Sequence, residues 1–571
     1  MARWTLKENK EIPKNFSHIL NPLIASILFS RGIEDEEKMK RFISPDYETD
    51  SYDPFLFDDM EKVIERIGQA QDKKETVAIF GDYDADGITA SVVIKETLDL
   101  LEIESFVYIP DKRTEGYGMN IEAVENFKEK NVALIITVDC GITSFHEVEK
   151  ANKFGIDVII TDHHHVPDKL PKALAIINPH RKNCRYPFTD LAGVGVAFKV
   201  VQAIYQRFLP EKIEQTKWML DLVAIGTIAD RVSLVGENRI FAKYGLMVLS
   251  KTKRIGLKEI FKVGRLLIDE QNLPDTRKVS FHIAPRINAA GRINHANLAL
   301  DLIMEKNVAE ARELALELEA NNTERQKVTE KIVEEIKILA ETIYKEKKFI
   351  FAINEHFSMG VVGLVAGKIA QEFNKPTAVF QKCEDISKGS FRSIPQINII
   401  ETISECQELL DKFGGHSQAA GVSVANENLE KFYAKMDRLI NEKLEGVDLS
   451  EEIGIDAEVL VQDINFELAE ELQKLEPFGE GNREPVFLIR NLEIREKKVV
   501  GNGNKHIKLF LADSEKKSPK ILEAISFNSY EKYINIKAGD KVEIVCNIQK
   551  DEWNGNRKVQ LMLIDLKLTE N

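Results

Sequence analysis

The sequence predicts a multidomain α/β protein with a long helix near its centre and a small β-barrel at its C-terminal end. Three observations support this. Short apolar segments alternate with amphipathic ones between about residues 61 and 180, as in parallel sheets. Residues 306–347 hold almost no glycine or proline and space Leu, Ile and Val as a helix does. From about residue 450, apolar and polar residues alternate as in half-buried strands.

The composition is that of a folded protein. The 571 residues are 43% hydrophobic and 30% charged, which excludes wholesale disorder. The net charge of −15 argues against a protein that coats nucleic acid through its overall charge. Five scattered cysteines form no C-x-x-C pair, so we expect a reducing compartment and no zinc ribbon. No signal-peptide pattern or membrane-spanning run is seen, so we expect a cytoplasmic protein.

The first two segments are an N-terminal segment and a catalytic domain. Residues 1–60 are rich in acidic and aromatic residues without a steady period, and we expect them to pack on the catalytic domain. Residues 61–305 form that domain, with a largely parallel sheet. Its expected strands are residues 76–80, 106–110, 132–139, 156–162 and 173–179.

The next two segments are a helix and a second α/β domain. As one helix, residues 306–347 would span roughly 60 Å. A coiled-coil dimer arm is one interpretation, but the irregular apolar heptad favours a spacer between domains. Residues 348–449 read as an α/β domain that contains the glycine-rich segment FGGHSQAAG.

Residues 450–571 read as a barrel of about five strands, with Asn-Gly in DEWNGN as a hairpin turn. Residues 488–571 carry a net charge of +4 on an otherwise acidic chain. This favours a nucleic-acid-binding domain, although a solvated barrel surface would explain the charge nearly as well.

The strongest local signal is GDYDADG at residues 81–87, between a strand and a helix. Asp82, Asp84 and Asp86 crowd three carboxylates into five residues. Like charges this close repel one another, and a bound cation is the usual remedy. An EF-hand needs ligands spread over twelve residues and a closing Glu, and an acidic helix N-terminus explains one Asp but not three. We therefore expect a metal site.

Further candidate ligands follow the next strands and one apolar helix. They are Asp139, Asp162, His163, His164 and Asp230, with His165 as the expected bystander. The carboxyl ends of parallel strands gather at one edge of a doubly wound sheet, so these side chains can converge. Carboxylates with imidazoles favour Mn²⁺ or Mg²⁺ over structural zinc. Two such ions would activate a water for in-line attack on a phosphoryl group.

These motifs resemble a known superfamily. GDYDADG, VDCG, TDHH and GTIAD, in this order, resemble the DHH phosphoesterases. NPHRKNCRYPFTDLAGVGVAFK, APRINAAGR, GSFRSIP, FGGHSQAAG and LEPFGEGN resemble segments of the RecJ family, the single-strand-specific 5′→3′ DNA exonucleases of bacteria. The resemblance runs from about residue 60 to the C-terminus. It implies a DHH domain, a connecting helix, a DHH-associated domain and a C-terminal OB-fold.

The resemblance also implies the chemistry of the site. Family roles carry over to six metal ligands, Asp82, Asp84, Asp86, Asp139, His163 and Asp230, which would hold two Mn²⁺ or Mg²⁺ ions. His164 would contact metal or the scissile phosphate, and Asp162 would orient a histidine. The implied reaction releases 5′-mononucleotides from single-stranded DNA in repair and recombination. The implied partners are a helicase and a single-strand-binding protein, and a monomer is expected.

Substrate contacts are expected from three motifs. The candidates are Arg286, Asn288, Arg292, Ser390, Arg392, Gly414, Gly415 and His416. Guanidinium groups fork onto phosphate oxygens, and glycines let backbone N–H groups approach a phosphate, the more so if a helix begins there. Ordinary ion pairing is the alternative for the arginines, and the glycine segment alone is weak evidence.

The barrel offers candidate stacking platforms and backbone contacts. The aromatic candidates are Phe510, Phe527, Tyr530, Tyr533 and Trp553, although strand aromatics more often belong to a core. The basic candidates, as a group, are Lys505, Lys508, Lys550, Arg557 and Lys558.

The chain also departs from the family pattern. Phe80 stands where some relatives have a metal-ligating His, Arg231 replaces an expected apolar residue, and GRINHANLAL lacks an expected glycine. Two other functions stay open. A short RNA or a cyclic dinucleotide is a possible substrate, but small DHH relatives with such substrates usually lack the barrel. A binding or scaffold protein with a dead site would have lost ligands that this chain retains.

Overall fold

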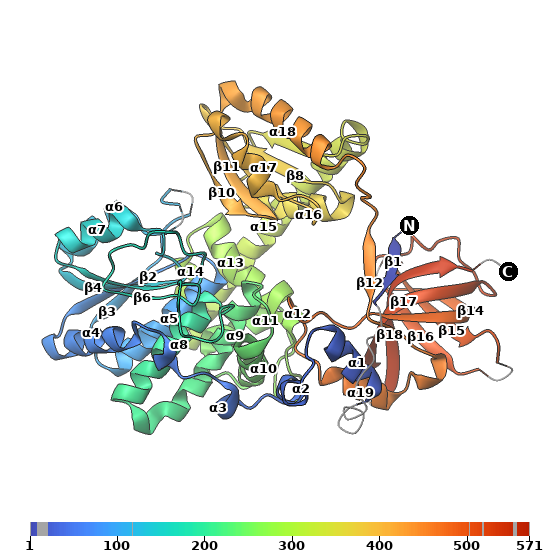
Figure 1. Ribbon diagram of the computed structural model, residues 1–571, viewed down its shortest axis with the longest axis horizontal. Coiled ribbons are helices and arrows are strands. Elements are labelled where there is room, and N and C mark those ends of the chain that lie inside the picture. Colours follow the sequence, from blue (N-terminus) through green and yellow to red (C-terminus); the bar gives the residue numbers. More distant parts are fainter. Residues whose placement is uncertain are drawn as a thin grey trace. The chain divides into compact units, whose positions relative to one another are not determined.

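The computed structural model describes residues 2–7, 21–112, 114–116, 118–501, 503–516, 519–551 and 557–569 (Figure 1). The chain divides into two compact units. The larger comprises Tyr52–Val232 and Phe241–Leu449, and the smaller comprises Met1–Ser51, Ser233–Ile240 and Ser450–Asn571. Among the described residues, no helix is both long and apolar enough to cross a membrane.

A five-stranded parallel sheet organises the first part of the larger unit, as the alternating pattern predicts. Its order is β3-β2-β4-β5-β6, and every neighbouring pair is parallel. The strands are β2 (Thr76–Gly81), β3 (Ser105–Tyr108), β4 (Val132–Val138), β5 (Asp157–Thr161) and β6 (Ala175–Ile177). Because β3 and β4 flank β2 on opposite sides, the order reverses at the carboxyl end of β2, where such sheets bind ligands.

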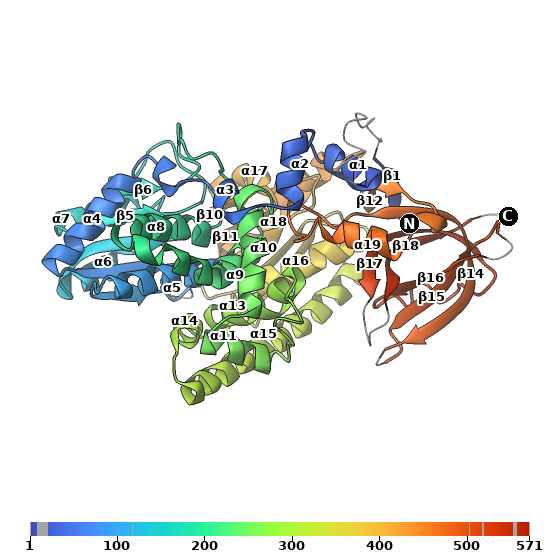
Figure 2. The same ribbon diagram turned by 90° about the horizontal axis from the view of Figure 1, so that it is seen from below.

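Helices cover both faces of this sheet (Figure 1 and Figure 2). One face packs on α6 (Ile121–Glu129) and α7 (Phe145–Lys153) through a buried core that includes Phe80, Val124 and Val148. The other face packs on α4 (Met60–Lys73), α5 (Ala85–Leu100) and α8 (Gly193–Phe208). A buried α5 agrees with its sequence, in which apolar residues surround the whole helix rather than one stripe.

A group of helices follows and ends in one of 35 residues. Its members are η3 (Pro210–Met219), α9 (Leu220–Ala229), α10 (Gly236–Ser250), α11 (Ile255–Val263), α12 (Thr276–Lys278), the π-helical η4 (Val279–Ile283), α13 (Ala284–Ile293), α14 (Asn297–Met304) and α15 (Val308–Thr342). The first half of α15 packs on α11, α13 and α14, and its second half packs on α16. This helix lies within the range predicted for the connecting helix.

The second sheet of the larger unit has the order β10-β11-β9-β8-β7, and only β7 and β8 run parallel. Its elements are β7 (Ile350–Asn354), α16 (Val362–Phe373), β8 (Thr377–Gln381), β9 (Ile386–Arg392), α17 (Ile399–Ser404), η5 (Gln407–Leu409), β10 (Lys412–His416), β11 (Ala419–Ala425), η6 (Asn426–Asn428) and α18 (Leu429–Lys443). The glycine-rich segment is thus an exposed edge strand, β10, rather than a loop before a helix. Gly415, at φ +151°, leaves no room for a Cβ atom, which would lie 2.3 Å from the Ala419 oxygen.

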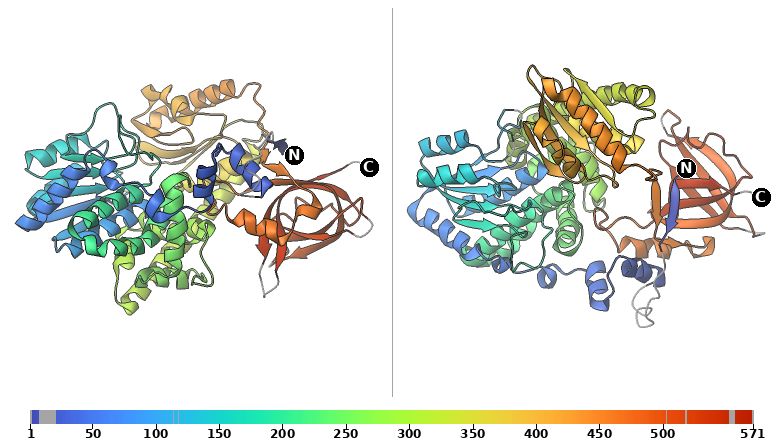
Figure 3. Two further views of the ribbon diagram at one scale, coloured as in Figure 1. Left: turned by 60° about the horizontal axis from the view of Figure 1, so that its bottom comes forward. Right: turned by 45° about the horizontal axis from the view of Figure 1, so that its top comes forward.

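The C-terminal strands close into a barrel, as the alternating pattern predicts (Figure 3). The order is β14-β15-β16-β18-β17, and β17 pairs back to β14. The elements are β12 (Glu452–Ile455), β13 (Ala457–Glu458), η7 (Val461–Asp463), α19 (Phe466–Gln473), β14 (Phe487–Val500), β15 (His506–Asp513), β16 (Ile521–Ser526), β17 (Lys541–Asp551) and β18 (Lys558–Leu568). Asp551 pairs with Lys558, while the turn between them and Trp553 lie outside the described residues.

The segment 1–60, predicted to pack on the catalytic domain, is divided between the two units. Ile24, Ile27 and Leu28 share one buried core with the barrel strands, whereas Phe57 stacks on Tyr186 of the catalytic domain, with ring centroids 4.0 Å apart. The elements are β1 (Arg3–Leu6), which pairs in parallel with β12, α1 (Pro22–Ser30), α2 (Glu36–Ile43), α3 (Tyr47–Asp50) and η2 (Pro54–Leu56). The apolar face of α1 predicts burial but not the partner that buries it.

Arg239 belongs to the same unit and is fully buried, with 1% of its surface exposed. Its guanidinium stacks over the ring of Phe42 at 3.9 Å. It donates hydrogen bonds to the backbone oxygens of Phe42 (2.6 Å), Leu475 (2.9 Å) and Glu476 (2.7 Å). A buried guanidinium is tolerated only when its N–H groups are paired, and these backbone oxygens supply the pairing.

Candidate active site

The carboxylate-rich loop joins β2 to α5 at the reversal point of the parallel sheet. Asp84 is the N-cap of α5, and its Oδ1 accepts the N–H groups of Asp86 (2.9 Å) and Gly87 (3.2 Å). A Cβ atom on Gly87 would lie 2.5 to 2.7 Å from the backbone and Cβ atoms of Asp82, so glycine lets the helix start against the backbone of that residue. Capping therefore uses one oxygen of Asp84 and holds three carboxylates in one turn.

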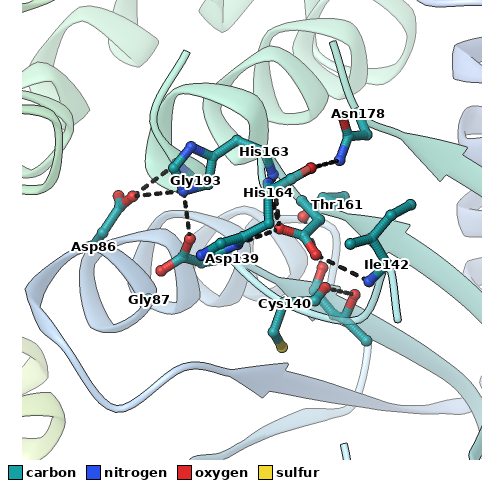
Figure 4. A network of polar contacts seen from close by, with 12 residues as sticks. Asp86, Gly87, Asp139, Cys140, Ile142, Thr161, His163, His164, Asn178 and Gly193 are labelled. Carbon is teal, nitrogen blue, oxygen red and sulfur yellow. Dashed lines mark hydrogen bonds and ion pairs between the residues drawn. The ribbon is translucent and has the colours of Figure 1, made fainter. Parts of the chain in front are cut away.

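His163, which follows β5, brings the other carboxylates together (Figure 4). Its Nε2 lies 3.1 Å from Asp139 Oδ1, 3.6 Å from Asp230 Oδ2 and 4.0 Å from Asp86 Oδ2. Three overlapping groups of ligand atoms lie within 4.8 Å of one another: Asp139, His163 and His164; Asp86, His163 and Asp230; Asp82, Asp84 and Asp139. The structure thus brings all six sequence-predicted metal ligands to one place.

The electrostatics of this cluster fit bound cations. Burial and the neighbouring carboxylates raise the pKa of Asp82, Asp86 and Asp139 well above their usual range. Burial and His164 lower the pKa of His163 to about 4, so its imidazole is neutral, as a metal ligand must be. Asp82 Oδ1 and His163 Nε2 are buried without a hydrogen-bond partner. Leaving a buried acceptor unpaired destabilises the fold, so each such atom calls for an explanation. A carboxylate oxygen and an imidazole nitrogen are ligand atoms that suit Mn²⁺ or Mg²⁺.

Asp162 holds His164 in place (Figure 4). Its Oδ1 lies 2.8 Å from His164 Nδ1 and also accepts the His164 backbone N–H at 3.0 Å. Its Oδ2 accepts the N–H of Ile142 at 2.9 Å. Burial by itself would lower the pKa of His164, but the hydrogen bond and the charge of Asp162 raise this pKa to about 9. Asp162 thus contacts the His164 ring through one of its oxygens, and His165 is exposed.

Asp86 is anchored at the start of α8. Its carboxylate accepts the N–H groups of Gly193 (2.7 Å) and Val194 (2.8 Å). The helix N-terminus favours this negative charge. A Cβ atom on Gly193 would lie 2.4 Å from Asp139 Oδ1, so the GVG of the sequence leaves room for a second carboxylate.

Lys112 and Arg292 lie near the carboxylates, and Arg392 lies near both of these cations. Lys112 was not among the predicted residues. Asp82 and Asp84 raise the pKa of Lys112, but burial and Arg292 outweigh them and bring it to about 8. Arg292 donates to the Gly360 oxygen at 3.1 Å, and its positive charge lowers the pKa of Arg392 further after burial has lowered it. The signal for Lys112 was weak, since one lysine in a turn after β3 has no motif around it.

Arg392 and Ser390 lie side by side on β9, where Arg392 Nη1 donates to Ser390 Oγ at 3.0 Å. The other predicted substrate residues are placed differently. Arg286 forms a two-point ion pair with Glu319, at 2.6 and 3.1 Å. Asn288 Oδ1 accepts the Ala85 N–H at 2.7 Å, on the metal-binding loop.

The structure describes the positions of the residues that depart from the family pattern. Phe80 is fully buried in the sheet core beside Tyr108 and Phe127. Arg231 directly follows Asp230 and adopts φ +63°. Among the barrel candidates, Tyr533 is buried and Phe527 is 55% exposed.

Family models match three successive parts of the chain. They describe the DHH family N-terminal domain at residues 76–227, the DHHA1 domain at 346–442 and the RecJ OB domain at 455–565. The single-stranded-DNA-specific exonuclease RecJ of Haemophilus influenzae is 31% identical to this chain, over 98% of each. The chain belongs to the RecJ family. The RecJ exonuclease of Bacillus subtilis (strain 168) is 38% identical over 96% of this chain and 68% of its own length.

Solved RecJ structures have the same fold. RecJ of Thermus thermophilus in complex with Mn²⁺ matches with a TM-score of 0.83 and 26% identity, over 100% of this chain and 80% of that one. The same protein in complex with Mg²⁺ matches with a TM-score of 0.76. The carboxylate and imidazole groups of this RecJ site fit either ion.

Proposed function

We propose that this chain is a single-stranded-DNA-specific 5′→3′ exonuclease that releases 5′-mononucleotides by two-metal-ion hydrolysis. The observation that carries the proposal is the convergence of Asp86, Asp139 and Asp230 on His163 and of Asp82 and Asp84 on Asp139. Buried atoms of Asp82 and His163 are left without hydrogen bonds. Retention of the full ligand set argues against a scaffold with a dead site. The names of the relatives, single-stranded-DNA-specific exonucleases, support the substrate.

The residues of the site have three proposed roles: metal binding, orientation of His164 and positioning of the carboxylates. Asp82, Asp84, Asp86, Asp139, His163 and Asp230 hold two Mn²⁺ or Mg²⁺ ions, which supply an activated water and neutralise phosphoryl charge. Asp162 fixes the His164 ring through Nδ1, so that Nε2 faces the reacting phosphate as a donor. The loop and α8 amides hold the carboxylates in place before substrate arrives, which lowers the reorganisation that the reaction requires.

Cationic residues next to the metal-binding loop suit the terminal phosphate of a strand. Burial lowers the pKa of Lys112, Arg292 and Arg392, because it removes water from their positive charges. A bound phosphate would stabilise these charges in place of the lost water. Ser390 adds a hydroxyl to Arg392. The exposed strand β10, with Gly414, Gly415 and His416, offers its backbone to the next nucleotides. The barrel adds a sequence-tolerant surface for single strands.

The rest of the proposal concerns organisation and setting. The domains are a DHH catalytic domain at 61–305, a connecting helix at 306–347, a DHH-associated domain at 348–449 and an OB-fold at 450–571. The protein acts as a cytoplasmic monomer in DNA repair and recombination, together with a helicase and a single-strand-binding protein.

The test is a nuclease assay on 5′- and 3′-labelled single strands, with duplex DNA and an oligoribonucleotide alongside. We expect a 5′ label to be released first as mononucleotide with Mn²⁺ or Mg²⁺, and no cleavage in EDTA. Release from the 3′ end, equal cleavage of duplex, or cleavage of RNA alone would each overturn the corresponding part of the proposal.

A further inference from the structure

A carboxylate that has no part in the proposed chemistry, Glu115, holds the turn that follows β3. Its Oε2 accepts the hydroxyl of Tyr108 at 2.5 Å and the side-chain N–H of Asn120 at 2.8 Å. Its Oε1 accepts the backbone N–H of Asp111 at 2.8 Å. Donors from the end of a strand, from the turn and from the residue that caps a helix thus meet at one side chain.

Two of these donors belong to rigid elements. Tyr108 is the last residue of β3, where it pairs in register with Phe80 of β2, and the two rings pack with their centroids 5.4 Å apart. Burial and the hydrogen bond to Glu115 raise the pKa of Tyr108, so its hydroxyl stays protonated as a donor. Asn120 caps α6, because its Oδ1 accepts the N–H of Ala123 at 2.7 Å. Glu115 therefore ties the turn to the sheet and to α6.

The turn itself is compact, and it carries Lys112. The N–H groups of Thr114, Glu115 and Gly116 reach the oxygen of Asp111, at 3.2, 2.8 and 3.3 Å. Asp111 is thus bound through its oxygen to the turn and through its N–H to the Glu115 carboxylate. Lys112 directly follows Asp111, so the backbone from which the lysine side chain starts has a fixed place.

Lys112 extends from this turn to the metal-binding loop. Its Nζ lies 4.5 Å from the centroid of the Tyr83 ring, a distance at which the face of an aromatic ring attracts a cation. Tyr83 stands between the ligand candidates Asp82 and Asp84 in the sequence. The geometry therefore brings the ammonium group beside the loop that would hold the metals.

Packed atoms connect Tyr83 to the two arginines of the proposed phosphate site. A Cβ atom on Gly291 would lie 3.6 Å from the Cβ of Tyr83. The next residue, Arg292, donates to the Gly360 oxygen at 3.1 Å, just before α16. A Cβ atom on the glycine in the first turn of that helix would lie 3.2 Å from Arg392 Nη2. The ammonium group and both guanidinium groups thus adjoin the same packed segments, as binding of one phosphate by all three requires.

We propose that Glu115 is a positioning residue, which holds Lys112 where it binds the terminal phosphate of the strand. A lysine side chain is flexible, and a fixed backbone lowers the entropy that is lost when its ammonium group binds an anion. The inference rests on the proposed function and adds to it the residue that sets the preference for a 5′-phosphorylated strand. If Glu115 only stabilised the turn, its loss would change stability but not that preference.

The experiment measures kcat/KM in Mn²⁺ for two oligodeoxythymidines that differ only in a 5′-phosphate or a 5′-hydroxyl group. Glu115→Gln keeps the size of the side chain but leaves one acceptor oxygen for three donors. We expect the preference for the phosphorylated strand to fall about 10-fold, as for the loss of one charge-assisted hydrogen bond, mainly through a higher KM. Glu129→Gln, at an exposed position of α6, is the control and should match the wild type.

Further variants show whether Glu115 acts through Lys112. If it does, the double variant Lys112→Met/Glu115→Gln should have the same preference as Lys112→Met alone, whereas losses that multiply overturn the inference. Mn²⁺ affinity should stay at the wild-type value in Glu115→Gln, and weaker Mn²⁺ binding with an intact preference also overturns it. Tyr108→Phe removes one of the three donors. It should show a smaller loss of preference, and it carries the test if Glu115→Gln does not fold.

Failure of the inference and failure of the proposed function give different results. Equal kcat/KM of the wild type for both strands, or the wild-type preference in folded Glu115→Gln, overturns the inference while cleavage from the 5′ end persists. Absence of cleavage of either strand by the wild type would instead overturn the proposed function.

Discussion

Asn288 on α13 accepts the backbone N–H of Ala85 through its side-chain oxygen at 2.7 Å, between the metal-ligand candidates Asp84 and Asp86. The same helix approaches the loop again at Gly291, where a Cβ atom would lie 3.1 Å from the Tyr83 oxygen. A helix that sequence motifs assign to substrate binding therefore also shapes the metal site.

We predict that Asn288→Ala weakens Mn²⁺ binding by roughly 10-fold or more, the range seen when outer residues that orient metal ligands are removed. Isothermal titration calorimetry of the metal-free protein measures it. Binding of single strands in EDTA should be unchanged. Asn294→Ala, at an exposed position just after α13, is the control. Weaker DNA binding with normal Mn²⁺ affinity would show that Asn288 contacts the substrate instead.

Asp139→Ala should abolish cleavage, with a loss of at least about 10³-fold in kcat. Its fold should survive, because the variant removes a buried carboxylate whose pKa is raised by burial and by Asp86. Relief of that repulsion predicts a melting temperature in EDTA equal to or above that of the wild type. Cleavage at the wild-type rate would place the site elsewhere.

His164→Gln should lower kcat by about 10²-fold or more while Mn²⁺ affinity changes little, because Asp162 holds the ring through Nδ1 and the proposed role of Nε2 is to donate to the phosphate. His165→Gln is the matched control, since that side chain is exposed. Steady-state kinetics measures kcat, and a metal titration measures the Mn²⁺ affinity. A large loss of Mn²⁺ affinity in His164→Gln would make His164 a metal ligand.

The metal-free protein should lose stability as pH rises from 3.8 to about 6. Burial and Asp84 raise the pKa of Asp230 from 3.8 to about 6. The folded state then binds this proton more tightly than the unfolded state, so the free energy of unfolding falls across that window, by up to about 1.4 kcal/mol per pH unit for each such group. Urea unfolding in EDTA at several pH values measures the slope.

Mn²⁺ should reverse this trend, because it binds the ionised carboxylates and so stabilises the folded state more at pH 7 than at pH 5. An Asp230→Asn variant should flatten the slope in EDTA. A metal-free protein that gains stability between pH 4 and 6 would contradict the charge crowding described here.

Phe527→Ala should weaken binding of single strands without changing the salt slope, since stacking releases no counterions. Loss of about 1–3 kcal/mol per stacked base predicts a fall in affinity of roughly 5-fold to 150-fold. Leu568→Ala, another exposed apolar residue of the barrel, is the control. Fluorescence anisotropy over a salt series measures the affinity and the salt slope. An unchanged affinity would show that Phe527 does not stack on a base.

The sequence predicted best where neighbours in the chain are also neighbours in space. Asp82, Asp84 and Asp86 lie in one turn, and the edge of a parallel sheet brings Asp139 and His163 beside them by a general rule of topology. The β-barrel followed from alternation in the same way, because a half-buried strand must alternate.

Contacts between distant segments could not be predicted in this way. Lys112 follows a short strand with no motif, and its cationic neighbours are 180 and 280 residues away. The pairing of Arg286 with Glu319 depends on how α13 lies on α15. The FGGH segment forms an edge strand because β11 offers it backbone partners, which its own residues do not reveal.

The backbone oxygens around Arg239 bear on how this protein can change over evolution. They come from residues 42 and 474–477, while the guanidinium itself comes from residue 239, in the middle of the chain. A gene shortened before codon 450 would encode a charged side chain stripped of most of its acceptors. A chimaera that takes its C-terminal region from a relative must likewise keep the backbone conformation at residues 474–477. The segment around Arg239 and the C-terminal region are therefore expected to fold together as one unit.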